Sequence, residues 1–98
     1  MKDFKISSRV LEKLQSRHQV TREEVLQAFM NREGPLLTDN RLDHRTDPPT
    51  IWFCAPTDRG RLLKVIFVER DEHFEIKSAY EPTDGSDRLY ERIRAKKK

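Results

Sequence analysis

One segment in the second half of the chain constrains the fold most. The stretch from Arg61 to Glu69 is dominated by Leu63, Val65, Ile66, Phe67 and Val68. β-branched and aromatic residues of this kind favour strands. Because side chains alternate between the two faces of a strand, both faces of this one are apolar. That pattern is typical of a strand at the centre of a sheet, with helices packed over one side.

The flanking segments read as the partners of this central strand. Thr50 to Ala55 is rich in strand-forming residues, and a turn that ends in Gly60 leads from it into the central strand. On the other side, the polar residues at 70–72 turn the chain back into His73 to Tyr80. The second half therefore predicts a three-stranded antiparallel meander. Leu36-Leu37 is a candidate for a brief edge strand, which would be the fourth.

The first half has the periodicity of two helices. Ser7 or Ser8 can cap a helix that runs to about Arg17, with an apolar stripe at Val10, Leu11 and Leu14. Thr21 and Glu24 have the spacing of a capping box, and the apolar face of a second helix follows up to the Gly34-Pro35 step. Near the end of the chain, Ser86 or Asp87 can cap a third helix. We therefore expect one α+β domain over residues 1–98, with two N-terminal helices packed on a three- to four-stranded antiparallel sheet and a short C-terminal helix.

The residue inventory argues against several classes of protein. Cys54 is the only cysteine, so no intrachain disulfide can form, which fits a reducing compartment. No apolar run is long enough to span a membrane, and the first ten residues lack the apolar stretch of a signal peptide. Histidines and cysteine do not share a metal-ligand spacing, and three scattered glycines cannot build a phosphate loop. We expect a cytoplasmic protein with no membrane partner, no metal and no cofactor.

Positive charge is concentrated at the C-terminal end. Residues 88–98 contain six basic residues and one acid, and residues 94–98 form a basic tail. A basic segment on a nearly neutral body favours an anionic partner, either nucleic acid or an acidic protein. The alternative is a solvated, frayed terminus with no binding role.

Basic and aromatic residues on the predicted sheet are the candidates for chemistry. Arg61 and Lys64 lie on the central strand, and Lys77 and Tyr80 lie on the strand that should pair with it. Arginine supplies the charge and the forked donors that a phosphate needs, so Arg61 could hold the phosphate and Arg59 could assist from the turn. The aromatic rings of Tyr80 or Tyr90 could stack on an unpaired base.

Cleavage of RNA without a metal also requires proton transfer to and from the reacting oxygens. Lys64, His44 or His73 could serve there, and histidine is better matched because it titrates near neutrality. The alternative for each basic residue is a purely solubilising role, and for His44, beside Asp43, it is that of an ordinary loop residue. His18, at the end of the first helix, is assigned a structural capping role.

The order of these segments resembles a known family. The stretch VLEKLQSRHQVTREEVLQAF, then an acidic loop, then RGRLLKVIFVER, FEIKSAYEP and a terminal helix is similar to the BrnT-like toxins. It also resembles a related domain family of unknown function whose last strand ends in a Tyr-Glu-Pro step. Both look like members of the wider RelE/ParE superfamily, and the resemblance covers nearly the whole chain.

The resemblance implies a toxin of a type II toxin–antitoxin system, which cleaves RNA and is neutralised by an antitoxin protein. Arg61 and Lys64 match the basic strand positions. Tyr80 stands where BrnT-like toxins usually place an arginine, which shifts the expected phosphate contacts to Arg59, Arg61 and the terminal arginines Arg88, Arg92 and Arg94. Tyr90 is the closest match to a C-terminal tyrosine that can act at the site of RelE-like toxins.

Two hypotheses follow from the sequence. The first is a metal-independent endoribonuclease in which Arg61, Lys64, His44 and Tyr80 carry catalysis, while Arg59, Lys77, Arg88, Tyr90 and Arg92 bind RNA. The second is a non-catalytic RNA- or protein-binding module on the same fold, which the replacement of the expected arginine by Tyr80 favours.

Overall fold

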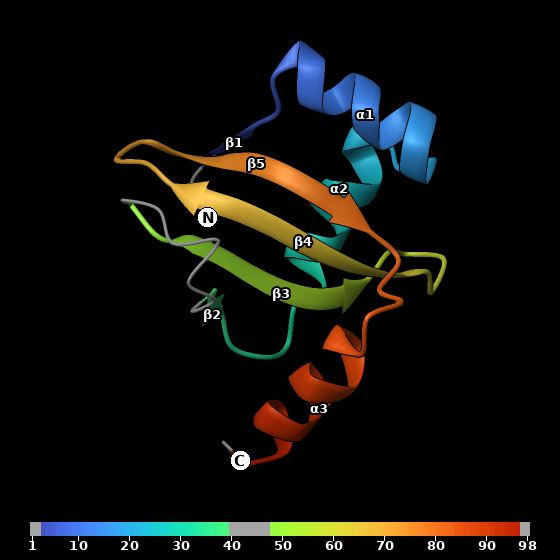
Figure 1. Ribbon diagram of the computed structural model, residues 1–98, viewed down its shortest axis with the longest axis vertical. Coiled ribbons are helices and arrows are strands. Elements are labelled where there is room, and N and C mark those ends of the chain that lie inside the picture. The colour runs from blue at the N-terminus through green and yellow to red at the C-terminus, as the bar shows by residue number, and fades with distance from the viewer. Residues whose placement is uncertain (1–2, 40–47, 97–98) are drawn as a thin grey trace.

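Three helices and a five-stranded mixed sheet make up the computed structural model, which describes residues 3–39 and 48–96 (Figure 1). In chain order the elements are β1 (Asp3–Lys5), α1 (Ser8–His18), α2 (Arg22–Met30), β2 (Leu37–Thr38), β3 (Thr50–Pro56), β4 (Leu62–Glu69), β5 (His73–Tyr80) and α3 (Ser86–Lys96). The strands lie in the order β1-β5-β4-β3-β2. The predicted α+β class is confirmed, and β4 occupies the centre of the sheet as its apolar composition indicated.

The sheet is larger than predicted, and it is not purely antiparallel. β1 pairs with β5 in parallel, with Phe4 opposite Phe74, whereas the other neighbouring strands pair antiparallel. The expectation of three to four antiparallel strands was wrong in this respect. A three-residue strand carries too little local pattern to reveal a partner that lies seventy positions further along the chain.

Local signals in the sequence set the helix ends. The Ser7 side chain accepts a hydrogen bond from the Val10 amide at 3.2 Å, and α1 ends at Gln19, which is left-handed with φ 50°. The capping box at α2 is present: the Thr21 hydroxyl accepts from the Glu24 amide, and the Glu24 carboxylate accepts from the Thr21 amide, both at 3.1 Å.

The core lies between one face of the sheet and helix α2. The Phe29 ring packs against four other phenylalanine rings, with centroid distances of 4.9 to 5.8 Å, to Phe4, Phe53, Phe67 and Phe74. This aromatic cluster joins β1, β3, β4 and β5 to the helix. The opposite face of the sheet is therefore left for other contacts.

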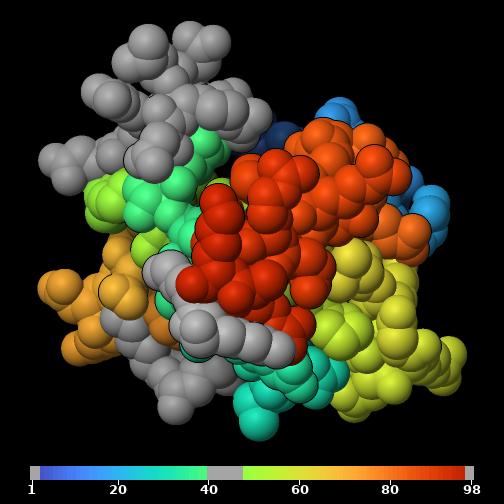
Figure 2. All heavy atoms as spheres, turned by 90° about the horizontal axis from the view of Figure 1, so that it is seen from below, coloured from blue at the N-terminus to red at the C-terminus, as the bar shows by residue number. Residues whose placement is uncertain are grey.

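Helix α3 packs on that other face. Adjacent residues on β3 point to opposite faces, and Phe53 meets α2 whereas the Trp52 ring lies 5.8 Å from that of Tyr90 on α3. Figure 2 shows α3 lying across the molecule beside the segment that follows α2. No helix of the described residues is long and apolar enough to cross a membrane.

Candidate functional site

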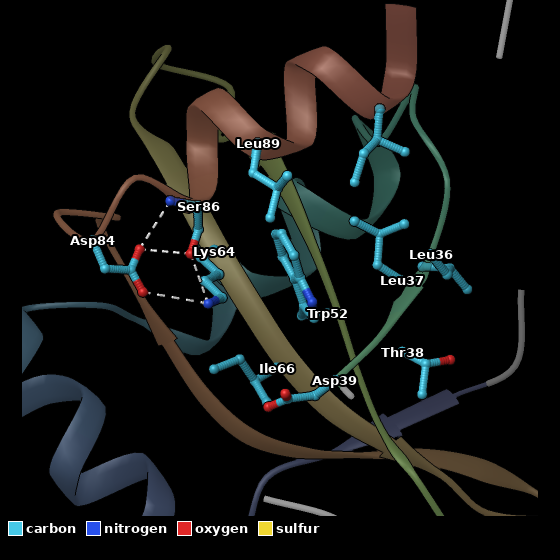
Figure 3. A pocket seen from close by; sticks show the side chains of 11 residues that line it. Leu36, Leu37, Thr38, Asp39, Trp52, Lys64, Ile66, Asp84, Ser86 and Leu89 are labelled. Atoms are coloured by element: carbon cyan, nitrogen blue, oxygen red, sulfur yellow. Dashed lines mark hydrogen bonds and ion pairs between the residues drawn. The ribbon is translucent and has the colours of Figure 1, made fainter. Parts of the chain in front are cut away.

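A cleft of about 690 Å³ opens on the sheet face that carries α3 (Figure 3). Its floor comes from β3 and β4, one wall from α3, and the other wall from β2 and its flanking residues. Most of the lining is apolar, namely Leu36, Leu37, Trp52, Ile66, Leu89 and Ile93. The polar groups are Lys64, Asp84 and Ser86 at one end, with Thr38 and Asp39 along the β2 wall. A volume of this size is ordinary for a ligand pocket or a groove that receives a partner's side chains.

Lys64 is the central polar residue of the cleft. It lies on β4 and is only 6% exposed, and its ammonium has both polar and aromatic partners. The Nζ atom donates to the Ser86 hydroxyl at 2.8 Å and lies 3.6 Å from the Asp84 carboxylate. It also stands 4.6 Å from the centre of the Trp52 ring. A buried ammonium needs such partners, because burial without them would disfavour its charge.

The Asp84 carboxylate ties this end of the cleft to the start of α3. It accepts hydrogen bonds from the Ser86 hydroxyl and from the Ser86 amide at 3.0 Å. These hydrogen bonds, helped by the charge of Lys64, lower the pKa of Asp84 to about 2. The side chain is 49% exposed, so a ligand arriving from solvent can reach this carboxylate.

Tyr80 and His18 continue a row of polar and aromatic groups away from Lys64. Tyr80 lies opposite Lys64 on the neighbouring strand, and the Lys64 Nζ atom is 5.9 Å from the centre of its ring. The His18 ring, at the end of α1, lies 5.5 Å from the Tyr80 ring. From Trp52 to His18, four side chains from four different elements are thus in succession.

Arg61 and Lys64 were predicted to act at one site, but the Arg61 side chain does not share the face of the sheet on which Lys64 lies. Its guanidinium donates to the carbonyl oxygens of His18 and Gln19, each at 2.8 Å. It also binds both oxygens of Glu24, at 3.0 and 3.1 Å, and the carboxylate of Glu81. These acceptors occupy the donors that were expected to hold a phosphate. Hydrogen bonds from Glu81 and Glu24 raise the pKa of Arg61 further above its usual value.

Tyr90 is also placed differently from the prediction. It is 1% exposed, its ring packs against Trp52, and its hydroxyl donates to the Pro35 carbonyl at 2.6 Å. Burial raises the pKa of this phenol to about 12. Tyr90 therefore anchors α3 to the body of the protein, and no base can stack on its ring in this arrangement.

The remaining predicted residues are dispersed. Arg59 is exposed in the turn between β3 and β4, and Lys77 pairs with Glu75 at 2.6 Å beside a bulge in β5. His73 lies at the opposite end of β5 from Tyr80. His44 lies outside the described residues.

The exposed cations of α3 are better placed. Arg88 and Arg92 stand one helical turn apart and form no ion pair with any residue that the structure describes, whereas Arg94 pairs with Glu33 and Glu91. Arg88 directly precedes Leu89 and Arg92 directly precedes Ile93, and both Leu89 and Ile93 line the cleft. These two arginines are therefore available to an anionic partner at the rim of the cleft.

Sequence reasoning missed Trp52 as a site residue and gave His18 only a structural role. Trp52 has the sequence pattern of an ordinary strand residue, and no local pattern predicts that a lysine on the neighbouring strand will cover its ring. The His18–Tyr80 contact joins residues 62 positions apart, and it follows from how α1 packs along β5. No protein-family model and no curated protein matches this chain.

Proposed function

We propose that this chain is an RNA-directed, toxin-like protein, a metal-independent endoribonuclease that acts in the cleft around Lys64. The observation that carries the proposal is the succession of Trp52, Lys64 and Tyr80 across three adjacent strands, an ammonium between two aromatic rings. Aromatic rings stack on unpaired bases, and an ammonium binds phosphate as a point charge. The order of helices and strands on which the resemblance to BrnT-like toxins rests is also present.

The site divides the work differently from the sequence-based hypothesis. Lys64, rather than Arg61, stabilises the charge that builds up on the phosphate. In the free protein the half-exposed Asp84 carboxylate pairs with the Lys64 ammonium. When RNA binds, the phosphate takes the place of this carboxylate. Tyr80 receives a base, and the unpaired Arg88 and Arg92 on α3 hold the backbone on the way into the cleft. Arg61 has a structural role.

Replacement of Lys64 by methionine tests this proposal. Methionine keeps an apolar stem against Trp52 and removes the charge, so RNA cleavage by K64M should fall by at least about 100-fold. The measurement is the cleavage rate of a pool of single-stranded RNA by the purified full chain without added metal. K13M, on the exposed side of α1, is the matched control and should cleave like the wild type. Equal rates for K64M and the wild type would contradict the assignment.

A second candidate function is the non-catalytic protein-binding module, and the cleft itself favours it. Leu36 is 40% exposed and Leu89 is 45% exposed, and both line the cleft. With Asp84 beside Lys64, the cleft offers an apolar surface that suits the side chains of a partner such as an antitoxin. Under this alternative, expression of the chain alone should neither arrest growth nor degrade RNA, and K64M should behave like the wild type in both respects.

A further inference from the structure

We propose that His18 is a further catalytic residue of this site, the group that takes the proton from the attacking 2′-hydroxyl of RNA. This inference rests on the proposed endoribonuclease function. Its basis is the position of the imidazole, whose ring lies 5.5 Å from that of Tyr80, while the Lys64 ammonium lies 5.9 Å from the centre of the same Tyr80 ring.

Among the histidines that the structure describes, only His18 lies at this site. The other one, His73, begins β5, whereas Tyr80 ends it, and seven residues of extended strand separate them by roughly 23 Å. Histidine is the side chain best matched to proton transfer near neutrality. The His18 side chain is half-buried, so the imidazole is both held in place and reachable from solvent.

The backbone beneath His18 is fixed by the network around Arg61. The guanidinium donates to the His18 and Gln19 carbonyl oxygens while Glu24 and Glu81 hold it from α2 and from the loop after β5. Gln19 is left-handed, which ends α1 directly after the histidine. Arg61 is thus a positioning residue, because it fixes the end of α1 against the strand that carries Tyr80.

The charged and titratable groups around His18 come from β5, from α2 and from the residues next to β4 and β5. Tyr80 of β5 contacts its ring, Arg61 just before β4 binds its carbonyl, and Glu24 of α2 and Glu81 after β5 reach it through Arg61. The Nζ atom of Lys64 lies 5.9 Å from the centre of the Tyr80 ring.

The chemical step balances with these groups alone. The proton of the 2′-hydroxyl passes to the neutral imidazole, and the 2′ oxygen forms a bond to phosphorus. The bond from phosphorus to the 5′ oxygen breaks, and that oxygen takes a proton from the Lys64 ammonium. The products are a 2′,3′-cyclic phosphate and a free 5′-hydroxyl, and exchange with water restores both side chains. A base and an acid that both lie beside Tyr80 are the two proton-transfer groups that this displacement needs.

The test compares H18Q with H73Q in the purified full chain, using single-stranded RNA and a 2′-O-methyl copy that cannot be cleaved. H18Q should lose at least about 100-fold in cleavage rate at pH 7 and still bind the 2′-O-methyl RNA like the wild type. H73Q should keep both the wild-type cleavage rate and the binding of the 2′-O-methyl RNA.

The outcomes separate the two proposals. Cleavage by H18Q at the wild-type rate would overturn the role of His18 and leave the endoribonuclease function standing. No cleavage by the wild type would overturn both. Loss of binding together with cleavage in H18Q would show that the histidine only supports the structure, which also contradicts its role as the base.

Discussion

At the scale of single residues, Arg61 and Lys64 show how three positions along a strand separate two roles. Side chains alternate at a period of two, so residues an odd number apart point to opposite faces. Arg61 therefore turns toward the junction of α1 and α2, where carboxylates and carbonyls take its donors. Lys64 turns toward α3 and the cleft. This alternation could have been applied to the sequence, whereas the partners of Arg61, 37 and 20 residues away, could not be foreseen from it.

Cys54 gives a prediction at the same scale. It is 6% exposed, and burial raises the pKa of its thiol to about 12. Because only the thiolate reacts, alkylation by iodoacetamide at pH 8 should be at least about 100-fold slower than for a small free thiol, and it should accelerate as pH rises toward 12. Mass spectrometry of the alkylated chain gives the rate, with denaturant as the positive control. Native-state labelling as fast as in denaturant would contradict the described burial.

At the scale of elements, α3 is joined to the rest of the protein by a few specific contacts. The buried Tyr90 packs on Trp52 and bonds to the Pro35 carbonyl, and Arg94 pairs with Glu33. The segment that follows α2 therefore holds the last helix in place (Figure 2). The helix itself was predictable from its capping residues and periodicity, but its side of the sheet was not, because that depends on these long-range contacts.

Gly34 is the position where this attachment is most sensitive. A Cβ there would lie 2.5 Å from the Tyr90 hydroxyl oxygen and under 3 Å from two ring carbons, so either the Tyr90 side chain or the segment around Gly34 must shift in G34A. We expect a loss of about 1–3 kcal/mol in the free energy of unfolding, measured by urea denaturation. Q15A, an exposed change on α1, should stay within about 0.5 kcal/mol of the wild type. A G34A protein as stable as Q15A would show that α3 is not held through this contact.

At the scale of the whole molecule, the sequence predicted the class of fold and most element boundaries, because these follow from local periodicity and capping. The capping box of Thr21 and Glu24 and the central position of β4 are examples. The parallel pairing of β1 and the contact of His18 with Tyr80 escaped prediction. Both join segments far apart in the chain, and local pattern carries no information about such partners.

Acid unfolding gives a prediction for the molecule as a whole. The pKa of Asp84 is lowered from 3.8 to about 2, mainly by hydrogen bonds from Ser86. A carboxylate whose pKa is lowered by folding stabilises the fold at pH values above its pKa in the unfolded chain. This contribution is lost as pH falls through the pKa of the folded state, about 2. The difference in unfolding free energy between the wild type and D84N should therefore have nearly its full size above pH 4 and shrink as pH falls toward 2.

D84N is the suitable change because asparagine keeps an acceptor for Ser86 and removes only the charge. D71N, in the exposed turn between β4 and β5, serves as the control and should show no such pH-dependent difference. A gap between the wild type and D84N that stays constant from pH 5 to pH 2 would refute the linkage.

The parallel pairing of β1 with β5 also has a consequence for biosynthesis. A ribosome releases residues 3–5 first, yet their partners at 73–75 follow some seventy residues later. The first strand must therefore wait, with Phe4 unpaired, while the hairpin of β3 and β4 can already close from neighbouring residues. Of the strands in this sheet, the one synthesised first is thus among the last to pair.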